Sequence, residues 1–332
     1  MDFAKSQICT EQGLIYFLGD GVGADADHSG PRMSLMRLQD LIACPEFRKG
    51  EPEKKAVYIN GVFSPFWRWC FKKGRKVLAP RGMLSGPALQ IKPLKKKIYL
   101  GLFTFFGMHR RVVFHVSSPA EEEDTYACFG ENIMLRRIGN VPFREFKTNE
   151  LVKESGRLNL ISVAQIAPIK NLHLVADALQ NVKGSIQWTI VGKVLDSKYL
   201  ELLKDAIKKV DAEIEVIIKG PCPFPEIRKL YSQNQVQILP SSSENFGHAH
   251  LEGLVLGLPL ITSNFVPWLD LEKSKAGFNL GLNSEAITMQ LQDFVDMDEM
   301  NFRPWAESAT EYARSKIDES SLKADYSNLF FG

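Results

Sequence analysis

Short apolar runs alternate with longer stretches of helical periodicity along the chain of 332 residues. The runs are rich in β-branched residues and lack the apolar–polar alternation of a half-exposed strand, as is typical of strands buried on both faces of a parallel sheet. Strands that alternate with helices predict parallel sheets covered by helices on both sides. The predicted strands span residues 14–18, 56–60, 76–79, 112–117, 133–138, 158–164, 187–192, 213–219, 235–239 and 258–262.

Helical patterns fill the intervals, and a polar stretch at residues 147–156 divides the strands into two series. We take this stretch as the boundary between a first domain, residues 1–146, and a second domain, residues 147–312. A helical tail follows at residues 313–332, and the sequence allows it to pack back on the first domain. The predicted helices span residues 33–43, 88–106, 119–129, 170–181, 197–210, 225–233 and 247–256, and the chain from about Pro304 onward.

Two α/β domains of this kind form a crevice at the carboxyl ends of their sheets, where open α/β folds bind ligands. The segment 235–271 carries the chemistry expected there. A buried strand ends at Leu239, a turn follows at residues 240–243, and a helix begins near Gly247. Free N–H groups and the positive end of the helix dipole suit a diphosphate. A glycine at position 247 lets the backbone approach a ligand closely.

Two glutamates, Glu244 and Glu252, flank this helix start with seven residues between them. Because carboxylates repel a phosphate, we expect both to accept hydrogen bonds from sugar or ribose hydroxyl groups. Glu252 lies in the predicted helix, on the face that it shares with His248 at i−4. The spacing alone is equally compatible with a helix that is capped by Ser243 or Glu244 and carries a solvated Glu252.

The same segment resembles the Glu-x7-Glu signature of the retaining family 4 glycosyltransferases. The matching residues, in order, are Pro240, Ser241, Glu244, Phe246, Gly247, Glu252, Gly257, Pro259, Ile261 and Ser263. The resemblance implies that Glu244 contacts the transferred sugar as a catalytic residue and that Glu252 binds the ribose of the nucleotide. It also implies that backbone groups bind the sugar and the diphosphate at Asn245, Phe246, Gly247 and His248.

Two further segments resemble the donor domain of that family. Residues 160–172 are similar to its first strand and the following loop, which carries an arginine and, five residues later, a lysine. Lys170 matches the lysine, a point charge for the diphosphate, and a surface lysine that opens a helix is the alternative. The arginine position holds Gln165, so half of the expected charged clamp is missing. Gly220 matches the glycine that lets the nucleotide base approach the backbone.

In the first half, residues 79–84 resemble a segment of bacterial members that build surface polysaccharides. Arg81 in this segment is our candidate for a first-domain contact to donor or acceptor, and a turn with a solvated arginine is the alternative. His115 matches another strand of the family, either as a ligand or as a packed histidine. The resemblance fails before about residue 56, so we expect a shortened first domain. Residues 19–23 are glycine-rich and stand either for the missing loop or for a plain one.

Composition narrows the function further. The net charge of +2 does not favour nucleic acid as a partner, and five scattered cysteines without metal-type spacing predict reduced thiols in a cytoplasmic protein. No Asp-x-Asp pair follows a predicted strand, so we expect no essential metal and no prosthetic group. The longest nearly apolar run, residues 98–108, is far shorter than the ~20 residues of a membrane-spanning helix. The N-terminus lacks the apolar core of a signal peptide.

Basic clusters at residues 68–76 and 92–97 lie beside aromatic residues at 66–71 and beside the apolar run 98–106. Such a surface suits peripheral docking at the inner face of an anionic membrane, where a lipid-linked acceptor would lie. A solvated face over an ordinary buried helix is the alternative.

These features predict an α/β protein of the GT-B type, with two Rossmann-like domains whose parallel sheets face a cleft. We expect it to transfer a sugar from a nucleotide-diphosphate sugar to a glycan or lipid-linked glycan in surface polysaccharide biosynthesis. Retention of configuration rests on the resemblance alone. The first alternative is a degenerate, non-catalytic protein that binds nucleotide or supports a partner transferase, as Gln165 and the short first domain would suit. The second is another GT-B enzyme, such as a sugar-nucleotide epimerase, against which the intact Glu-x7-Glu segment counts.

Overall fold

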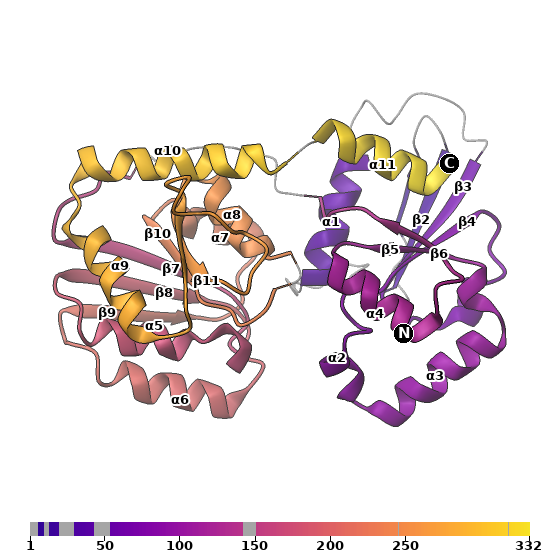
Figure 1. Cartoon of the computed structure of the whole chain (residues 1–332), viewed down its shortest axis with the longest axis horizontal. Helices are drawn as coiled ribbons and strands as arrows, with labels where there is room; N and C mark the ends of the chain where they lie inside the picture. The colour runs from indigo at the N-terminus through magenta and orange to yellow at the C-terminus, as the bar shows by residue number, and fades with distance from the viewer. Residues whose placement is uncertain are drawn as a thin grey trace. The chain divides into compact units, whose positions relative to one another are not determined.

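The chain folds into two compact units, which Figure 1 shows in a computed structural model. The structure describes residues 6–9, 13–19, 30–42, 54–141, 151–244, 246–317 and 319–332. One unit comprises residues 1–141 and 318–332, and the other comprises residues 142–317. The sequence-based boundaries, after residues 146 and 312, lie a few residues away. Most of the glycine-rich segment 19–23 lies outside the described residues.

The first unit is built on a six-stranded sheet in which the strands follow one another in chain order. All neighbours pair in parallel except the first two, which are antiparallel. The sequence did not indicate the short edge strand β1. The strands are β1 (Ser6–Cys9), β2 (Gly13–Gly19), β3 (Lys54–Asn60), β4 (Arg75–Ala79), β5 (Val113–Val116) and β6 (Met134–Arg137).

Alternate residues of these strands enter two different cores, because successive side chains of a strand point to opposite faces of the sheet. Ala56 and Tyr58 of β3 face a cluster that includes α1 and α11, whereas Val57 and Ile59 face a cluster that includes α3. The helices of this unit are α1 (Gly30–Ile42), α2 (Gly86–Gln90), α3 (Pro93–Phe105), α4 (Pro119–Phe129) and α11 (Glu319–Phe331), with short 3-10 turns at Phe66–Arg68 and Met108–Arg110.

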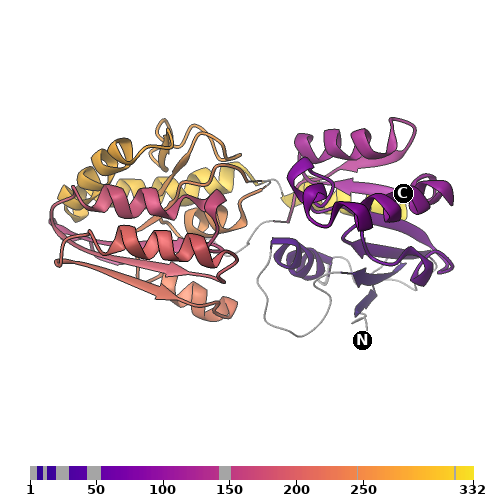
Figure 2. The same cartoon turned by 90° about the horizontal axis from the view of Figure 1, so that it is seen from below.

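The C-terminal helix α11 packs on the first unit although the second unit precedes it in the chain. Its buried residues Tyr326, Leu329 and Phe330 join the core formed with α1, and the ring of Phe330 lies 5.8 Å from that of Tyr58. Figure 1 and Figure 2 both show this yellow helix along the strands of the first unit. The sheet of the first unit therefore owes much of the cover on this face to the last residues of the chain.

The second unit is a doubly wound sheet of six parallel strands in the order β12-β11-β10-β7-β8-β9. Counted from β9, with the six strands numbered in chain order, this is the order 3-2-1-4-5-6 of nucleotide-binding α/β folds. Its strands are β7 (Arg157–Val163), β8 (Ser185–Val191), β9 (Ile214–Lys219), β10 (Val236–Leu239), β11 (Leu260–Ser263) and β12 (Gly277–Leu280). Its helices are α5 (Leu172–Leu179), α6 (Ser197–Ile207), α7 (Phe224–Tyr231), α8 (His248–Val255), α9 (Ser284–Asp296) and α10 (Glu299–Ser315), with a 3-10 turn at Pro168–Lys170.

Two helix predictions were wrong in detail. The helix expected over residues 88–106 is two helices, because Lys92 adopts a left-handed conformation, φ 56°, directly before Pro93, and a proline disfavours helical geometry in the residue before it. The helix expected from about Pro304 begins at Glu299 instead. The Asp298 side chain caps it by accepting from the Asn301 N–H at 2.9 Å, so Pro304 lies inside α10.

Candidate active site

The candidate site lies where the strand order of the second unit reverses. β7 and β10 are neighbours in the sheet, but their connections run in opposite directions, to β8 and to β11. At such a switch point the loops that follow the two strands diverge and leave a crevice at their carboxyl ends, where doubly wound folds bind ligands. The loop after β7 carries Lys170, and the loop after β10 carries Glu244.

Short polar contacts join these two loops. The Ser242 N–H donates to the Ile169 carbonyl at 2.8 Å. Asn171, in a left-handed conformation, donates from its side-chain amide to the Pro240 carbonyl at 2.9 Å and to the Ser242 hydroxyl at 2.6 Å. The loops therefore hold each other in one geometry.

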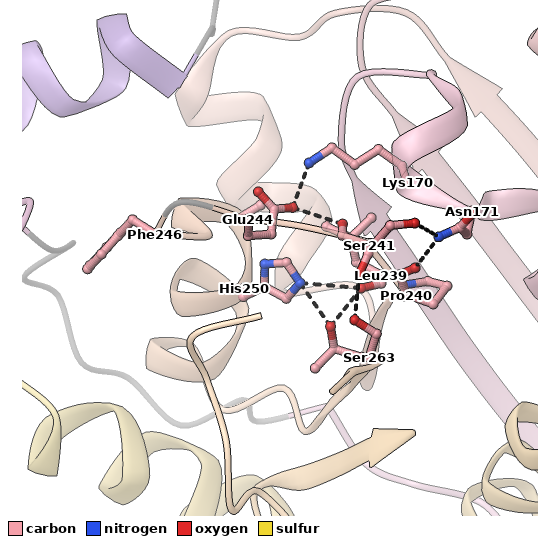
Figure 3. Close-up of polar contacts among 12 residues, drawn as sticks. Lys170, Asn171, Leu239, Pro240, Ser241, Glu244, Phe246, His250 and Ser263 are labelled. Carbon is pink, nitrogen blue, oxygen red and sulfur yellow. Dashed lines mark hydrogen bonds and ion pairs between the residues drawn. The ribbon is translucent and has the colours of Figure 1, made fainter. Parts of the chain in front are cut away.

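Lys170 and Glu244 form an ion pair across this junction. The Lys170 Nζ lies 2.5 Å from Glu244 Oε1, and the Ser241 hydroxyl donates to the same oxygen at 2.8 Å (Figure 3). Both side chains are largely buried, with exposed fractions of 16% and 15%. The alternative of a surface lysine is therefore wrong for Lys170.

Glu244 is ionised in this setting. Burial raises the pKa of its carboxyl group, but the charge of Lys170, the neighbouring His250 ring and the hydrogen bonds from Lys170 and Ser241 outweigh that effect. The pKa of Glu244 therefore lies below its ordinary value. The site presents a carboxylate whose counter-charge is already in place.

His250 lies beside this pair and was not among the predicted site residues. Its ring is buried, and Nε2 lies 3.1 Å from the Thr262 hydroxyl and 3.3 Å from the Leu239 carbonyl. Because the Thr262 hydroxyl donates to the Leu239 carbonyl at 2.8 Å, the hydrogen between Thr262 and His250 belongs to Nε2. In the neutral ring Nδ1 is therefore an acceptor.

Helix α8 begins at His248, with Gly247 at its N-cap position, and a glycine has no side chain that could cap the helix. Gly247 has φ 73°, and a Cβ atom there would lie 2.7 Å from His250 Nδ1 and 2.9 Å from Trp268 Nε1. The protein's own packing thus requires glycine at this position. Trp268 Nε1 donates to the Phe246 carbonyl at 2.7 Å, which fixes the approach to the helix, while Asn245 lies outside the described residues.

The other predicted donor-site residues lie around the same edge of the sheet. Glu252 sits on α8 with only 5% of its surface exposed, so the alternative of a solvated Glu252 is wrong. The ring of His248 lies 4.8 Å from that of Phe246. Gln165 follows β7 and is half-buried, and Gly220 follows β9, where a Cβ atom would meet nothing within 4 Å.

In the first unit, Arg81 follows β4 and bonds to uncharged groups. Its guanidinium donates to the Asn60 side-chain oxygen at 3.0 Å, to the Tyr58 hydroxyl at 2.7 Å and to the Asn140 side-chain oxygen. The next N–H group, of Gly82, donates to the buried Glu121 at 2.7 Å, which fixes the turn. Arg81 is therefore an ordered cation at the carboxyl ends of β3 and β4, and the alternative of a solvated arginine is wrong.

His115 lies behind Arg81 and is fully enclosed. Its Nδ1 accepts from the Tyr58 hydroxyl at 2.8 Å, and its Nε2 lies 3.0 Å from the Ile138 carbonyl. Burial, together with the charge of Arg81, lowers the pKa of His115 to about 3, so the ring is neutral. With both nitrogens engaged and 1% exposure, His115 supports Arg81 through Tyr58 and is the packed histidine of the two alternatives.

Among the described side chains, no group of histidine, cysteine, aspartate and glutamate residues is arranged to hold a metal ion. Within the same part of the chain, Cys70, Cys128 and Cys222 are free thiols.

We expect Lys170→Met to lower the free energy of unfolding by about 1.5–3 kcal/mol at neutral pH, as for a lost hydrogen bond to a charged group. Since the folded pKa of Glu244 is depressed from its ordinary 4.5, the pair stabilises the fold above that pH and loses its effect as the pH falls through the folded pKa. In the variant, burial raises the pKa, so the two proteins converge in acid. Urea denaturation over a pH series measures this difference.

Lys273→Met is the matched control. It breaks an exposed ion pair with Asp270, whose N···O distance is 3.0 Å and whose side chains are 83% and 61% exposed. Such a pair contributes about 0.2–1 kcal/mol. Equal losses in the two variants, or a Lys170→Met effect independent of pH, would contradict the role assigned to the Lys170–Glu244 pair.

Comparison with known proteins gives a family resemblance for the second unit and a fold for the chain. Residues 143–304 match the family described as Glycosyl transferases group 1. A search of curated proteins gives no match. Among solved structures, HepE of Anabaena in complex with UDP-glucose superposes with a TM-score of 0.66 at 13% identity, over 95% of this chain and 98% of that one.

Two further structures are similar. WaaG, a glycosyltransferase involved in lipopolysaccharide biosynthesis, superposes with a TM-score of 0.61 at 13% identity, over 92% of this chain and 96% of that one. TarM of S. aureus superposes with a TM-score of 0.63 at 14% identity over 84% of this chain, which spans about half (55%) of the length of TarM. The chain therefore has the α/β fold of GT-B glycosyltransferases, and its second unit resembles the group 1 glycosyl transferases in sequence.

Proposed function

We propose that the chain transfers a sugar from a nucleotide-diphosphate sugar to a glycan or lipid-linked glycan acceptor, with retention of configuration, in the synthesis of a surface polysaccharide. One observation carries the proposal. Lys170, Glu244 and the start of α8 come together at the switch point of a doubly wound sheet. The match to group 1 glycosyl transferases and the UDP-glucose complex of HepE support a nucleotide sugar as the donor.

In this proposal the diphosphate binds at the start of α8, where backbone N–H groups and the helix dipole attract anions. Lys170 adds a positive charge beside the diphosphate. Together, the start of α8 and Lys170 stabilise the negative charge that develops on the departing nucleotide. Glu244 accepts hydrogen bonds from the sugar, and Glu252 accepts them from the ribose. We infer front-face departure of the nucleotide and expect no metal requirement.

Arg81 is the part of the first unit that we assign to donor or acceptor. Its charge is bonded to neutral side chains, and among the described residues no carboxylate forms an ion pair with it. An arginine in that state suits an anionic group, since its planar fork matches phosphate and carboxylate oxygens.

The alternative function is a non-catalytic nucleotide-binding protein. Gln165 favours it, because a neutral amide stands where related enzymes carry an arginine. Incubation with UDP-glucose, GDP-mannose and ADP-glucose distinguishes the two proposed functions. Release of free nucleoside diphosphate, with or without an added glycan, supports the transferase, whereas tight binding without turnover supports the alternative.

Mutants of Glu252 and Glu244 should show different defects. Glu252→Ala removes hydrogen bonds that are equally strong in the ground and transition states, so it should weaken binding of the free nucleoside diphosphate by about 1.5–3 kcal/mol. Glu244→Ala should depress turnover more than nucleotide affinity, because its contacts to the sugar strengthen as positive charge grows on the ring. Calorimetry with UDP and rate measurements with the nucleotide sugar check both.

Glu285→Ala on α9, outside the proposed site, is the control and should change neither quantity. The assignment is reversed if Glu244→Ala loses the bare nucleotide while Glu252→Ala keeps it. If neither change affects binding or transfer, the non-catalytic alternative prevails.

We further propose that α3 brings the first unit to an anionic membrane that carries the acceptor. Only Phe103 of α3 is buried, whereas large apolar residues at spacings of three and four lie exposed along one stripe. These are Leu94, Ile98, Leu102 and Phe105, the last with 82% of its surface exposed. This stripe, the α3 stripe, speaks against a solvated face over an ordinary buried helix.

The charged residues of α3 and of the chain that leads into it are all positive. Lys92, Lys95 and Lys97 are exposed beside it, and residues 54–120 contain 14 lysines and arginines and no aspartate or glutamate. An amphipathic helix with apolar residues on one face and lysines at its edges lies in the interface of anionic bilayers. Within the described residues, no helix has the length and hydropathy to cross a bilayer.

The pair of changes Ile98→Ser and Phe105→Ser should lower binding to vesicles of phosphatidylcholine and phosphatidylglycerol by at least about tenfold, since each removes apolar area worth roughly 1–2 kcal/mol. Added salt should weaken the wild-type interaction, because lysines supply the rest of the attraction. Vesicle co-sedimentation measures both effects. Phe265→Ser, at an exposed aromatic of the second unit, is the control. If the double variant binds vesicles like the wild type, or differs from it only in oligomeric state, the α3 stripe does not bind membranes.

A further inference from the structure

His250 is the buried titratable group of the site to which the proposed transfer gives no role. Its Nε2 is engaged by Leu239 and Thr262, whereas Nδ1 is buried and has no hydrogen-bond partner among the described residues. An unpaired buried acceptor is unfavourable, because it has lost its hydrogen bonds to water. The contacts of Nε2 fix the ring, and the lone pair of Nδ1 is left without a hydrogen-bond donor.

The space beside Nδ1 is too small for a substrate group. Nδ1 is buried and packs against Gly247, where a Cβ atom would lie 2.7 Å away, so a substrate group reaches this nitrogen only if the loop moves. A proton does fit. Figure 3 shows this nitrogen on the side of the ring that faces the Glu244 side chain.

Two charged groups face His250, Glu244 from the loop after β10 and Lys170 from the loop after β7. The strands β10 and β11 present only the Leu239 carbonyl and the Thr262 hydroxyl. Burial lowers the pKa of His250, the Glu244 carboxylate raises it, and the Lys170 charge lowers it again, with the net result below the ordinary value of 6.5. With Lys170 on Glu244, the ring is neutral.

We propose that His250 takes up a proton at Nδ1 when the diphosphate of the donor draws Lys170 away from Glu244, and that it then holds the carboxylate in place of Lys170. The inference rests on the proposed function. The departing lysine removes a charge that opposes protonation, and the carboxylate left without its partner favours it. The proton comes from solvent and returns when the nucleotide leaves. His250 is thus a positioning residue that keeps Glu244 charged and oriented toward the sugar.

Donor binding is then linked to proton uptake, so affinity for the donor rises as the pH falls, by up to about tenfold per pH unit where the free histidine is neutral and the bound one protonated. Isothermal calorimetry with UDP-glucose in phosphate and in Tris tests this, because the two buffers release protons with different heats. UDP-glucose is suited to the test because its diphosphate is esterified at both ends and does not titrate near neutral pH.

In wild-type protein the heat of binding should differ between the buffers by the amount that proton uptake requires. His250→Gln should abolish that difference and flatten the pH dependence of affinity. The glutamine amide can still donate to Leu239 and Thr262, so the fold is preserved. His109→Gln removes another buried histidine with a lowered pKa, in the first unit, and should leave the uptake unchanged.

Binding of UDP-glucose without proton uptake, or uptake that persists in His250→Gln, overturns this inference and leaves the proposed function intact. If UDP-glucose, GDP-mannose and ADP-glucose all fail to bind, the proposed function falls and this inference with it. Should His250→Gln not fold, the nitrogen chemical shifts of the wild-type imidazole rings decide. A histidine must pass from neutral to protonated on addition of UDP-glucose, and no such change overturns the inference.

Discussion

The candidate site depends on the ion pair between Lys170 and Glu244, two residues that are 74 positions apart in the chain. Removing two charges from water is costly, and a buried pair persists only where geometry is good and further hydrogen bonds satisfy its atoms. Here Ser241 supplies such a bond, and Asn171 and Ser242 tie the two loops together. The pair keeps a carboxylate ionised at the switch point, with its counter-ion beside it.

The sheet order explains why these residues meet. β7 and β10 are adjacent but lead to strands on opposite sides, so the loops after them diverge at the carboxyl edge. Lys170 and Glu244 stand at that divergence, and α8 starts directly behind Glu244 with a glycine that the surrounding rings require. Charge, helix dipole and backbone donors thus converge on one place, which is the arrangement that departure of a nucleoside diphosphate needs.

Sequence reasoning located every strand it named, and the strongest signals were the continuous apolar runs of buried parallel strands, as in residues 158–164. It missed β1 and β12, four-residue edge strands whose sequences contain no continuous apolar run. The pairing of Lys170 with Glu244 was beyond reach, since spacing along the chain does not say which loops touch. His250 escaped notice because its importance comes from Leu239 and Thr262 on two neighbouring strands rather than from a motif. The sequence did not decide whether the apolar residues of α3 are buried or exposed, for a similar reason. Only the packing of Phe103 shows which face of the helix is covered by the protein.

The central claim is that the donor binds at the Lys170–Glu244 crevice of the second unit. Hydrogen–deuterium exchange with and without UDP-glucose tests it most directly, because bound diphosphate must slow exchange of the N–H groups that it engages. The account predicts protection concentrated in residues 165–171 and 246–252. Protection confined to residues before 140, with the start of α8 unchanged, would contradict it.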